Sequence, residues 1–160
     1  MRVASRNPER VDRMALLCTG AQLPPAGDWL ERAATVRAHG SQAVAGAVVE
    51  RWFTPAYLAG RPDARAAHER MIASTPAEGY AGCCEAIATL DLREQLSAIT
   101  APTLAIAGED DPATPPVKLE EIVARVHDAK LLTVANSAHL ANAEQPGIIT
   151  PALIDHLEQR

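Results

Sequence analysis

Several features that mark specialised classes of protein are scarce or absent in this sequence of 160 residues. Aromatic residues make up only 3% of it, and no apolar run approaches the roughly 20 residues that span a bilayer. The first residues lack the apolar core of a signal peptide. Acidic residues outnumber basic ones by 20 to 15, which argues against a basic face for nucleic acid. We therefore expect a cytoplasmic protein that binds neither a membrane nor nucleic acid.

Cysteine and histidine are also too few, or too scattered, to suggest a metal site or a disulfide framework. The three cysteines are Cys18 and the adjacent pair Cys83 and Cys84, and we expect all three to be reduced and buried. Cys18 has neither a basic neighbour nor a glycine elbow, so it is not predicted to be a nucleophile. No two histidines have the i, i+4 spacing of a metal-binding helix. The sequence therefore predicts no metal and no other cofactor.

Apolar residues form 48% of the chain, which is enough for one core of ordinary size. Short continuous apolar runs at 14–18, 102–107 and 130–136 are typical of strands that are buried on both faces. Helical patterns separate the last two runs and follow the third. This alternation predicts an α/β fold with three parallel strands and flanking helices.

Prolines mark where several helices of this α/β part should begin or end. A first helix should stop at Asn7, because the following Pro8 disfavours helical backbone before it. Another helix is predicted over about 116–127. The terminal helix is predicted to begin after an N-cap at Thr150, since Pro151 would interrupt a helix already under way.

Residues 28–90 show only helical patterns and form a separate segment of the predicted architecture. Four short helices are expected there, with Gly40 ending the first. Their predicted N-caps are Asp28 in a capping box with Glu31, Ser41, Thr54 before Pro55, and Thr75 in a box with Glu78. We predict a lid at 28–90, inserted into an α/β core made of 1–27 and 91–160, above the carboxyl ends of the strands where such folds bind ligands.

Polar groups with the placement of a catalytic site occur in the two loops after the last two strands. The first loop contains Asp110 and Asp111 in GEDDPATPP, and the second contains His139 in NSAHLANAEQP. The 28 residues from Asp111 to His139 accommodate one helix and one strand, so both side chains should emerge at the same edge of neighbouring strands. A carboxylate that holds imidazole Nδ1 leaves Nε2 free to accept a proton from a nucleophile.

For either residue alone a structural role is the simpler interpretation. Asp111 could merely cap the turn that follows it, and His139 could be an ordinary polar loop residue. Their combined spacing and position favour a catalytic pair. Asp110 is expected to be an exposed neighbour, and the other four histidines are expected to be structural or solvated.

These loops resemble those of a known superfamily. GEDDPATPP fits the G-x-x-D-x-x-T-P turn of α/β-hydrolases, which implies that Asp111 is the catalytic acid, and SAHLANAEQP is similar to their histidine loop, which implies that His139 is the base. With ERWFTPAYL and TPAEGYAGCCEAIATLDLRE, nearly the whole chain resembles 3-oxoadipate enol-lactonases of the β-ketoadipate pathway for aromatic catabolism. The resemblance implies hydrolysis of 3-oxoadipate enol-lactone to 3-oxoadipate by a Ser-His-Asp mechanism.

The sequence departs from this family in its nucleophile. It contains no G-x-S-x-G elbow, and the segment RVASRNPERV resembles the end of the helix that follows that elbow. We therefore expect the chain to be the C-terminal part of a partial α/β-hydrolase fold, without the nucleophile and the oxyanion hole. An uncovered edge of the strand at 14–18 predicts self-association or dependence on the missing N-terminal half.

Alternative functions remain open at this point. Another lid-bearing α/β-hydrolase, such as an esterase or a carbon-carbon bond hydrolase, would carry the same two loops, and a non-catalytic fragment is a third interpretation. Trp52, at the end of a predicted lid helix, is a candidate for contact with the small lactone or ester substrate, although holding the lid helices together is the simpler interpretation of this residue.

Overall fold

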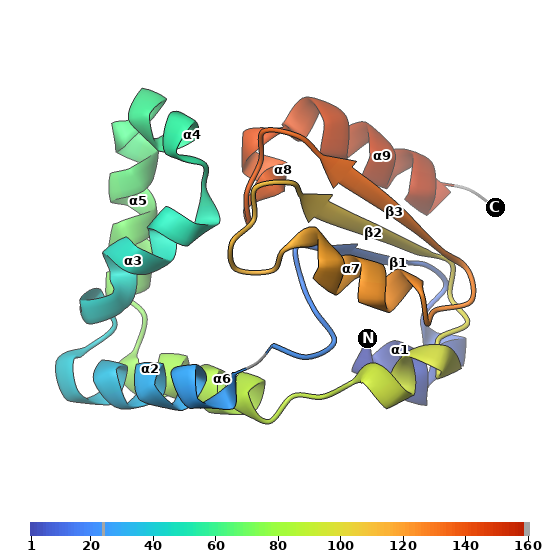
Figure 1. Ribbon diagram of the computed structural model, residues 1–160, viewed down its shortest axis with the longest axis horizontal. Coiled ribbons are helices and arrows are strands. Elements are labelled where there is room, and N and C mark those ends of the chain that lie inside the picture. The colour runs from blue at the N-terminus through green and yellow to red at the C-terminus, as the bar shows by residue number, and fades with distance from the viewer. Residues whose placement is uncertain (24, 159–160) are drawn as a thin grey trace. The chain divides into compact units, whose positions relative to one another are not determined.

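The computed structural model describes residues 1–23 and 25–158, and its contacts divide the chain into two compact units (Figure 1). The first unit combines residues 1–21 with 91–160, and the second comprises residues 22–90. The segment predicted as a lid, 28–90, falls within the second unit, which starts several residues before the predicted boundary. Within the described ranges no helix combines the length and the apolar character needed to cross a bilayer.

The first unit is built on a three-stranded parallel sheet, as the sequence predicts. The strands are β1 (Met14–Leu17), β2 (Thr103–Gly108) and β3 (Ala129–Val134), in the order β1-β2-β3. Leu16 is in register with Ala105, which in turn is in register with Leu131. The central strand β2 is almost wholly buried, as expected for a strand with helices on both faces.

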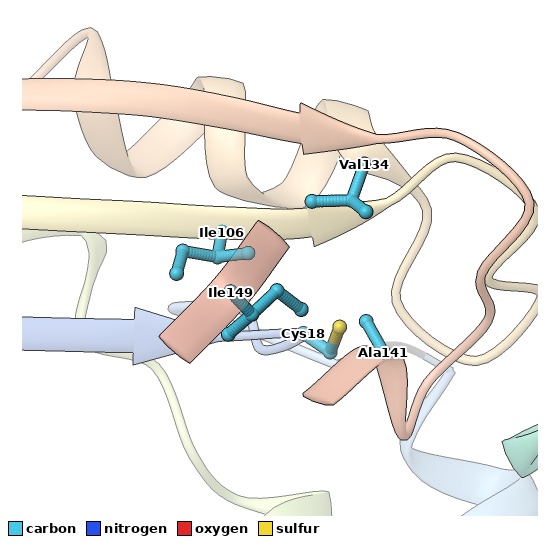
Figure 2. Close-up of a cluster of buried hydrophobic side chains, with 5 residues drawn as sticks. All are labelled: Cys18, Ile106, Val134, Ala141 and Ile149. Carbon is cyan, nitrogen blue, oxygen red and sulfur yellow. The ribbon is translucent and has the colours of Figure 1, made fainter. Parts of the chain in front are cut away.

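One face of this sheet carries a compact apolar cluster (Figure 2). Ile106 of β2 and Val134 at the end of β3 pack with Cys18, Ala141 and Ile149, all at most 6% exposed. Leu104, Leu132 and Leu153 are partly buried against the same cluster. Alternation along the strands turns Ala105 and Ala107 to the opposite face, and α7 (Pro116–Val123) contacts β2 and β3 there.

The remaining elements of the first unit are short helices that flank the sheet. They are α1 (Arg2–Arg6), the 3₁₀ helices η1 (Pro8–Arg10) and η2 (Arg93–Ala98), α8 (Ala141–Glu144) and α9 (Pro146–Glu158). The helix α1 stops at Asn7, as the following proline predicts. The helix α7 is shorter than predicted, because the chain leaves helical geometry before Ala129 to begin β3.

The predicted start of the terminal helix at Thr150 is wrong. The helix α9 begins at Pro146 and continues through Pro151. Pro151 lacks the N–H that would bond the Gly147 carbonyl, a loss of one ladder bond near the start of the helix. The earlier start buries Ile149 to 1% exposure, and burial of such a side chain contributes about 1.5–3 kcal/mol, comparable to the ~3 kcal/mol cost of an interior proline.

The described residues of the second unit contain five α-helices where four were predicted, and no strand. They are α2 (Ala26–His39), α3 (Gln42–Trp52), α4 (Pro55–Gly60), α5 (Pro62–Ala73) and α6 (Ala77–Ala88). The additional helix arises because the backbone turns out of helical geometry at Arg61 and Pro62 starts a new first turn. Within the unit α2 packs on α6 and α3 packs on α5.

The predicted helix caps are only partly correct. Thr54 caps α4, where its side chain accepts a hydrogen bond from the Tyr57 N–H. Ser41 precedes α3, but its hydroxyl donates to the Thr75 carbonyl instead of capping the helix. The hydroxyl of Thr75 donates to the Met71 carbonyl. These hydroxyl groups bond to carbonyls of other turns, so the sequence signature identified polar positions without identifying their partners.

Two further start and stop signals of the second unit have opposite outcomes. The capping box at Asp28 is wrong, because α2 already begins at Ala26 and Asp28 lies inside its first turn. Gly40 ends α2 as predicted, with a φ of 77° that favours glycine.

The expectation that all three cysteines are buried is wrong for Cys83, which is exposed, whereas Cys18 and Cys84 are buried.

The apolar cluster on the sheet can be tested with two isoleucines of the same helix. Replacing Ile149 by alanine should lower the free energy of unfolding by about 2–5 kcal/mol, because it leaves a cavity under α9. Ile154 is 48% exposed, so Ile154→Ala should change it by less than about 0.5 kcal/mol. Urea unfolding of both variants makes the comparison, and equal losses would contradict the placement of α9.

Candidate active site

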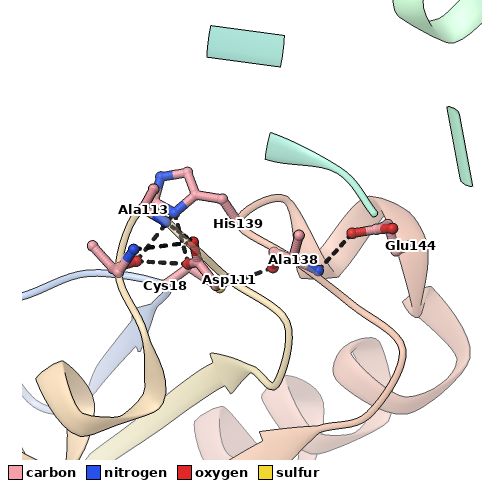
Figure 3. A network of polar contacts seen from close by, with 7 residues as sticks. Cys18, Asp111, Ala113, Ala138, His139 and Glu144 are labelled. Carbon is pink, nitrogen blue, oxygen red and sulfur yellow. Dashed lines mark hydrogen bonds and ion pairs between the residues drawn. The ribbon is translucent and has the colours of Figure 1, made fainter. Parts of the chain in front are cut away.

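The candidate site lies at the carboxyl ends of β2 and β3 (Figure 3). Residues 109–115 follow β2 and form the acid turn, and residues 135–140 follow β3 and form the histidine loop. Because the two strands are parallel neighbours, both segments leave the sheet at one edge. Backbone bonds join them: Asp110 N–H donates to the Ser137 carbonyl over 3.0 Å, and Glu109 N–H donates to the Val134 carbonyl over 2.9 Å.

Asp111 and His139 meet at this edge, as their spacing predicts. The Nδ1 atom of His139 lies 2.9 Å from Oδ2 of Asp111. The Asp111 residue is 3% exposed, whereas 26% of the His139 side chain is accessible. Since Nδ1 faces the carboxylate, Nε2 points away from it across the ring. The arrangement can therefore hold one imidazole nitrogen in place while the other exchanges a proton.

The acid turn also satisfies the simpler interpretation of Asp111 as a cap. Its Oδ1 atom accepts hydrogen bonds from the Ala113 N–H over 2.7 Å and the Thr114 N–H over 3.0 Å. One carboxylate oxygen thus shapes the turn and the other contacts the imidazole, so the two interpretations are compatible. Asp110 is exposed, in agreement with its predicted position beside the site.

Burial and hydrogen bonding act in opposite directions on Asp111. Burial alone raises the pKa of this carboxyl group, but the hydrogen bonds with His139 and Thr114 more than compensate and hold its pKa below the usual value. The carboxylate is therefore ionised at neutral pH. An ionised acid at Nδ1 favours the imidazolium that forms when Nε2 accepts a proton.

A second set of contacts holds the histidine loop. Oε2 of Glu144, from α8, accepts the Ala138 N–H over 2.7 Å, next to the histidine itself. Asn136 adopts a positive φ of 53°, and its carbonyl accepts a hydrogen bond from the Gln145 side chain over 3.1 Å. Sequence reasoning missed Glu144, because only the folded loop brings an acid five residues after the histidine back to the preceding N–H.

Gly108 determines how closely the two loops approach, and it too was missed. A Cβ atom at this position would lie 2.7 Å from the Ser137 oxygen and closer still to the Ala138 oxygen. Only a residue without a side chain leaves room for those carbonyls at the end of β2. The available signal was a glycine placed directly after a buried strand and before the acid turn.

Cys18 lies beside the site without the features of a nucleophile, as predicted. It directly follows β1 and has a positive φ of 43°, and its thiol donates to the Ala138 carbonyl over 3.6 Å. Burial raises the pKa of this thiol, and the nearby charge of Asp111 raises it further. A protonated thiol that is only 6% exposed is a poor nucleophile.

The other predicted or excluded site residues lie elsewhere. Trp52 belongs to the second unit, where its ring makes an edge contact with His68 at 6.3 Å between centroids, so its contact with substrate stays a prediction. His39 and His127 are exposed, and ring nitrogens of His68 and His156 bond to backbone carbonyls. Within residues 1–23 and 25–158 no group of three or more histidine, cysteine or acidic residues could hold a metal ion.

The sequence of this chain is similar to those of known hydrolases. Residues 1–146 match the family described as alpha/beta hydrolase fold. The chain is 36% identical over 139 residues to 3-oxoadipate enol-lactonase 2 of Acinetobacter baylyi, covering 87% of this chain and 52% of that protein. It is 35% identical over 118 residues to 3-oxoadipate enol-lactonase 1 of the same organism, covering 74% and 44%. The chain thus spans about half the length of these curated relatives.

Solved structures agree with the sequence comparison. An enol-lactonase from Burkholderia xenovorans LB400 superposes with a TM-score of 0.94 at 33% identity, covering 98% of this chain and 60% of the other. A thermophilic esterase from Thermogutta terrifontis gives a TM-score of 0.87 at 25% identity, covering 96% and 58%. The fold of this chain therefore continues, in these structures, into a further part that has no counterpart among its 160 residues.

The close approach at Gly108 can be tested by adding one methyl group. Gly108→Ala should lower the free energy of unfolding by about 1–3 kcal/mol or more and lengthen the Asp111–His139 contact, because the new Cβ displaces the histidine-loop carbonyls. Gly147→Ala, in the same unit, has no atom within 4 Å of the added Cβ and should be neutral or slightly stabilising. Chemical denaturation and an NMR measurement of the contact would show both effects, and identical behaviour of the two variants would contradict them.

The ionisation of Asp111 should appear as an acid limb in stability. Because its folded-state pKa lies below the unfolded value of about 4, the ionised carboxylate stabilises the fold above that pH. This contribution disappears as the pH falls through the lower folded-state pKa. The difference in free energy of unfolding between the wild type and Asp111→Asn should therefore be largest above about pH 4 and shrink below it.

Urea unfolding between pH 7 and pH 2 measures that difference. Asp110→Asn provides the matched control, since it removes an exposed carboxylate from the adjacent position. A gap between wild type and Asp111→Asn that stays constant over the whole range would show that Asp111 is not held ionised by its hydrogen bonds.

Proposed function

Since the chain belongs to the alpha/beta hydrolase family, we propose that it is the acid-and-base part of a Ser-His-Asp hydrolase acting on 3-oxoadipate enol-lactone. The observation that carries the proposal is the 2.9 Å contact between Asp111 Oδ2 and His139 Nδ1. Asp111 is the acid that orients the imidazole, and His139 is the general base. The product is 3-oxoadipate, as the names of the enol-lactonase relatives suggest.

The proposed reaction follows from the orientation of His139, whose Nδ1 faces Asp111 and whose Nε2 is left to exchange protons. Nε2 of His139 takes the proton of a serine hydroxyl as its oxygen attacks the lactone carbonyl. The carbonyl–oxygen bond of the ring then breaks, and the ring oxygen leaves as an enol that receives the proton from Nε2 and tautomerises to the ketone. Water, deprotonated by the same nitrogen, hydrolyses the acyl-enzyme and restores the serine. Asp111 stabilises the imidazolium present during each transfer.

The serine must be supplied from outside these 160 residues, because they contain no G-x-S-x-G elbow. We propose that it comes with a polypeptide that extends the sheet beside β1. The only neighbour of β1 in the described sheet is β2, so the N–H groups of Ala15 and Leu17 point to an open edge. The same polypeptide would supply the oxyanion-hole donors. Self-association through this edge is the alternative arrangement.

The narrower substrate assignment is supported by the relatives and by the helical unit. Both curated relatives are enol-lactonases, and the segments ERWFTPAYL and TPAEGYAGCCEAIATLDLRE, which resemble that family, lie mainly in the second unit. We propose that this unit is the lid and that Trp52 contributes an apolar surface to the substrate. Trp52 is half-buried at the end of α3, so part of its ring is available for contact.

An esterase is the second candidate function. The thermophilic esterase with a TM-score of 0.87 shares the fold at 25% identity, and an acid–histidine pair does not by itself select between lactones and open-chain esters. A carbon-carbon bond hydrolase would use the same pair, and a non-catalytic fragment would use neither residue.

Activity can be measured by supplying a polypeptide that carries the serine. The chain is combined with the N-terminal part of an enol-lactonase relative that carries the elbow, and hydrolysis of enol-lactone and of simple esters is compared. We expect a higher kcat/KM for the lactone than for the simple esters. His139→Ala should lower kcat by about 10³-fold or more, because a triad without its base loses most of its advantage.

His127→Ala is the control, since it removes an exposed histidine outside the site. A preference for simple esters would favour the esterase, and an unchanged rate in His139→Ala would exclude the proposed mechanism. The DNA upstream of the Met1 codon gives an independent result: an in-frame strand followed by G-x-S-x-G would identify the source of the serine, whereas a stop codon there would favour the fragment.

A further inference from the structure

We propose that Thr114 is a positioning residue whose hydroxyl group holds the Asp111 carboxylate in the orientation that accepts the Nδ1 proton of His139. The inference deepens the proposed function, on which its catalytic meaning rests, but the contacts that carry it belong to the described residues alone. Thr114 is the threonine of the acid-turn motif, three residues after Asp111, and the sequence assigns no role to it.

The hydroxyl of Thr114 completes a triangle with the two atoms of the proposed relay. Its Oγ1 atom lies 2.7 Å from Oδ2 of Asp111 and 3.1 Å from Nδ1 of His139, while Nδ1 and Oδ2 are 2.9 Å apart. Thr114 is 3% exposed, like Asp111, so the triangle is shielded from bulk water. A polar contact in such a site is stronger than one at the surface.

Counting protons assigns the direction of each bond. The Asp111 carboxylate is ionised and can only accept, so the single proton of the Thr114 hydroxyl is donated to Oδ2, its shorter contact. The hydroxyl oxygen then presents only lone pairs to Nδ1. Both neighbours of Nδ1 are therefore acceptors, and a lone pair on Nδ1 would be repelled by both. The proton of neutral His139 must stay on Nδ1, which leaves Nε2 unprotonated and able to act as the base.

Thr114 also prevents the carboxylate from turning. Its backbone N–H donates to Oδ1 of Asp111 over 3.0 Å while its hydroxyl donates to Oδ2 over 2.7 Å, so one residue holds both oxygens. The β-branched side chain restricts rotation about χ1, which keeps the hydroxyl in place. The plane of the carboxylate is thereby fixed relative to the imidazole.

Carboxyl NMR of the 160-residue chain tests the proposal without any turnover. In the wild type the pKa of Asp111 should lie below its usual value. Thr114→Val keeps the shape but removes the hydroxyl, and should raise the pKa of Asp111, because Oδ2 loses one of its two donors. Thr114→Ser keeps the hydroxyl and should retain the wild-type pKa of Asp111.

Thr103→Val is the matched control, because Thr103 is another 3% exposed threonine of the same unit and its hydroxyl donates to the Ala101 carbonyl, away from the relay. It should leave the pKa of Asp111 unchanged. If valine at 114 prevents folding, Thr114→Ala removes the same hydroxyl without the larger side chain. A wild-type pKa of Asp111 in a folded variant lacking this hydroxyl, or the same rise in Thr103→Val, would overturn the positioning role.

The assembled enzyme provides the second readout. Thr114→Val should lower kcat about tenfold with little change in KM, while Thr114→Ser keeps most of the activity. A raised Asp111 pKa in Thr114→Val, with no lactonase or esterase activity in the assembled wild-type enzyme, would support the positioning of Asp111 and contradict the proposed reaction. Full activity together with a wild-type Asp111 pKa in Thr114→Val would support the reaction and overturn the positioning role.

Discussion

The parallel pairing of β2 with β3 is the constraint on which the candidate site depends. Because the strands run side by side in the same direction, their carboxyl ends deliver two loops to one edge, and the loops are then joined by backbone bonds such as Asp110 N–H to Ser137 O. If β3 slipped by one residue against β2, Val134 would turn out of the apolar cluster that it forms with Ile106. The burial that fixes the register of the sheet therefore also fixes the distance between acid and histidine.

This placement creates an electrostatic problem that the acid turn resolves locally. A carboxylate taken out of water normally becomes harder to ionise, and Asp111 is 3% exposed. Four donors compensate: two backbone N–H groups at Oδ1, and the Thr114 hydroxyl with His139 Nδ1 at Oδ2. The turn supplies three of the four donors from residues that directly follow the acid, so the charge depends little on the rest of the chain.

The sequence was sufficient where the signal was local and repetitive. Continuous apolar runs predict the three strands and their parallel order, and the spacing of Asp111 and His139 predicts their contact. It was insufficient where a group chooses between several partners. The hydroxyl of Ser41 bonds to Thr75 instead of its own helix, Glu144 returns to the Ala138 N–H, and α9 begins at Pro146 because burial of Ile149 offsets the cost of Pro151.

The contacts around Asp111 and His139 are local to the first unit. The hydrogen bonds drawn in Figure 3 join residues of the first unit that lie between 108 and 144. The one exception is the bond from the Cys18 thiol, which also belongs to the first unit. Asp111 and His139 are thus oriented by their own loops. Such preorganisation removes the need to reorient dipoles as charge develops on an imidazole. Under the proposed function, a serine brought to Nε2 by another segment would therefore meet a base whose tautomer and direction are already set by folding.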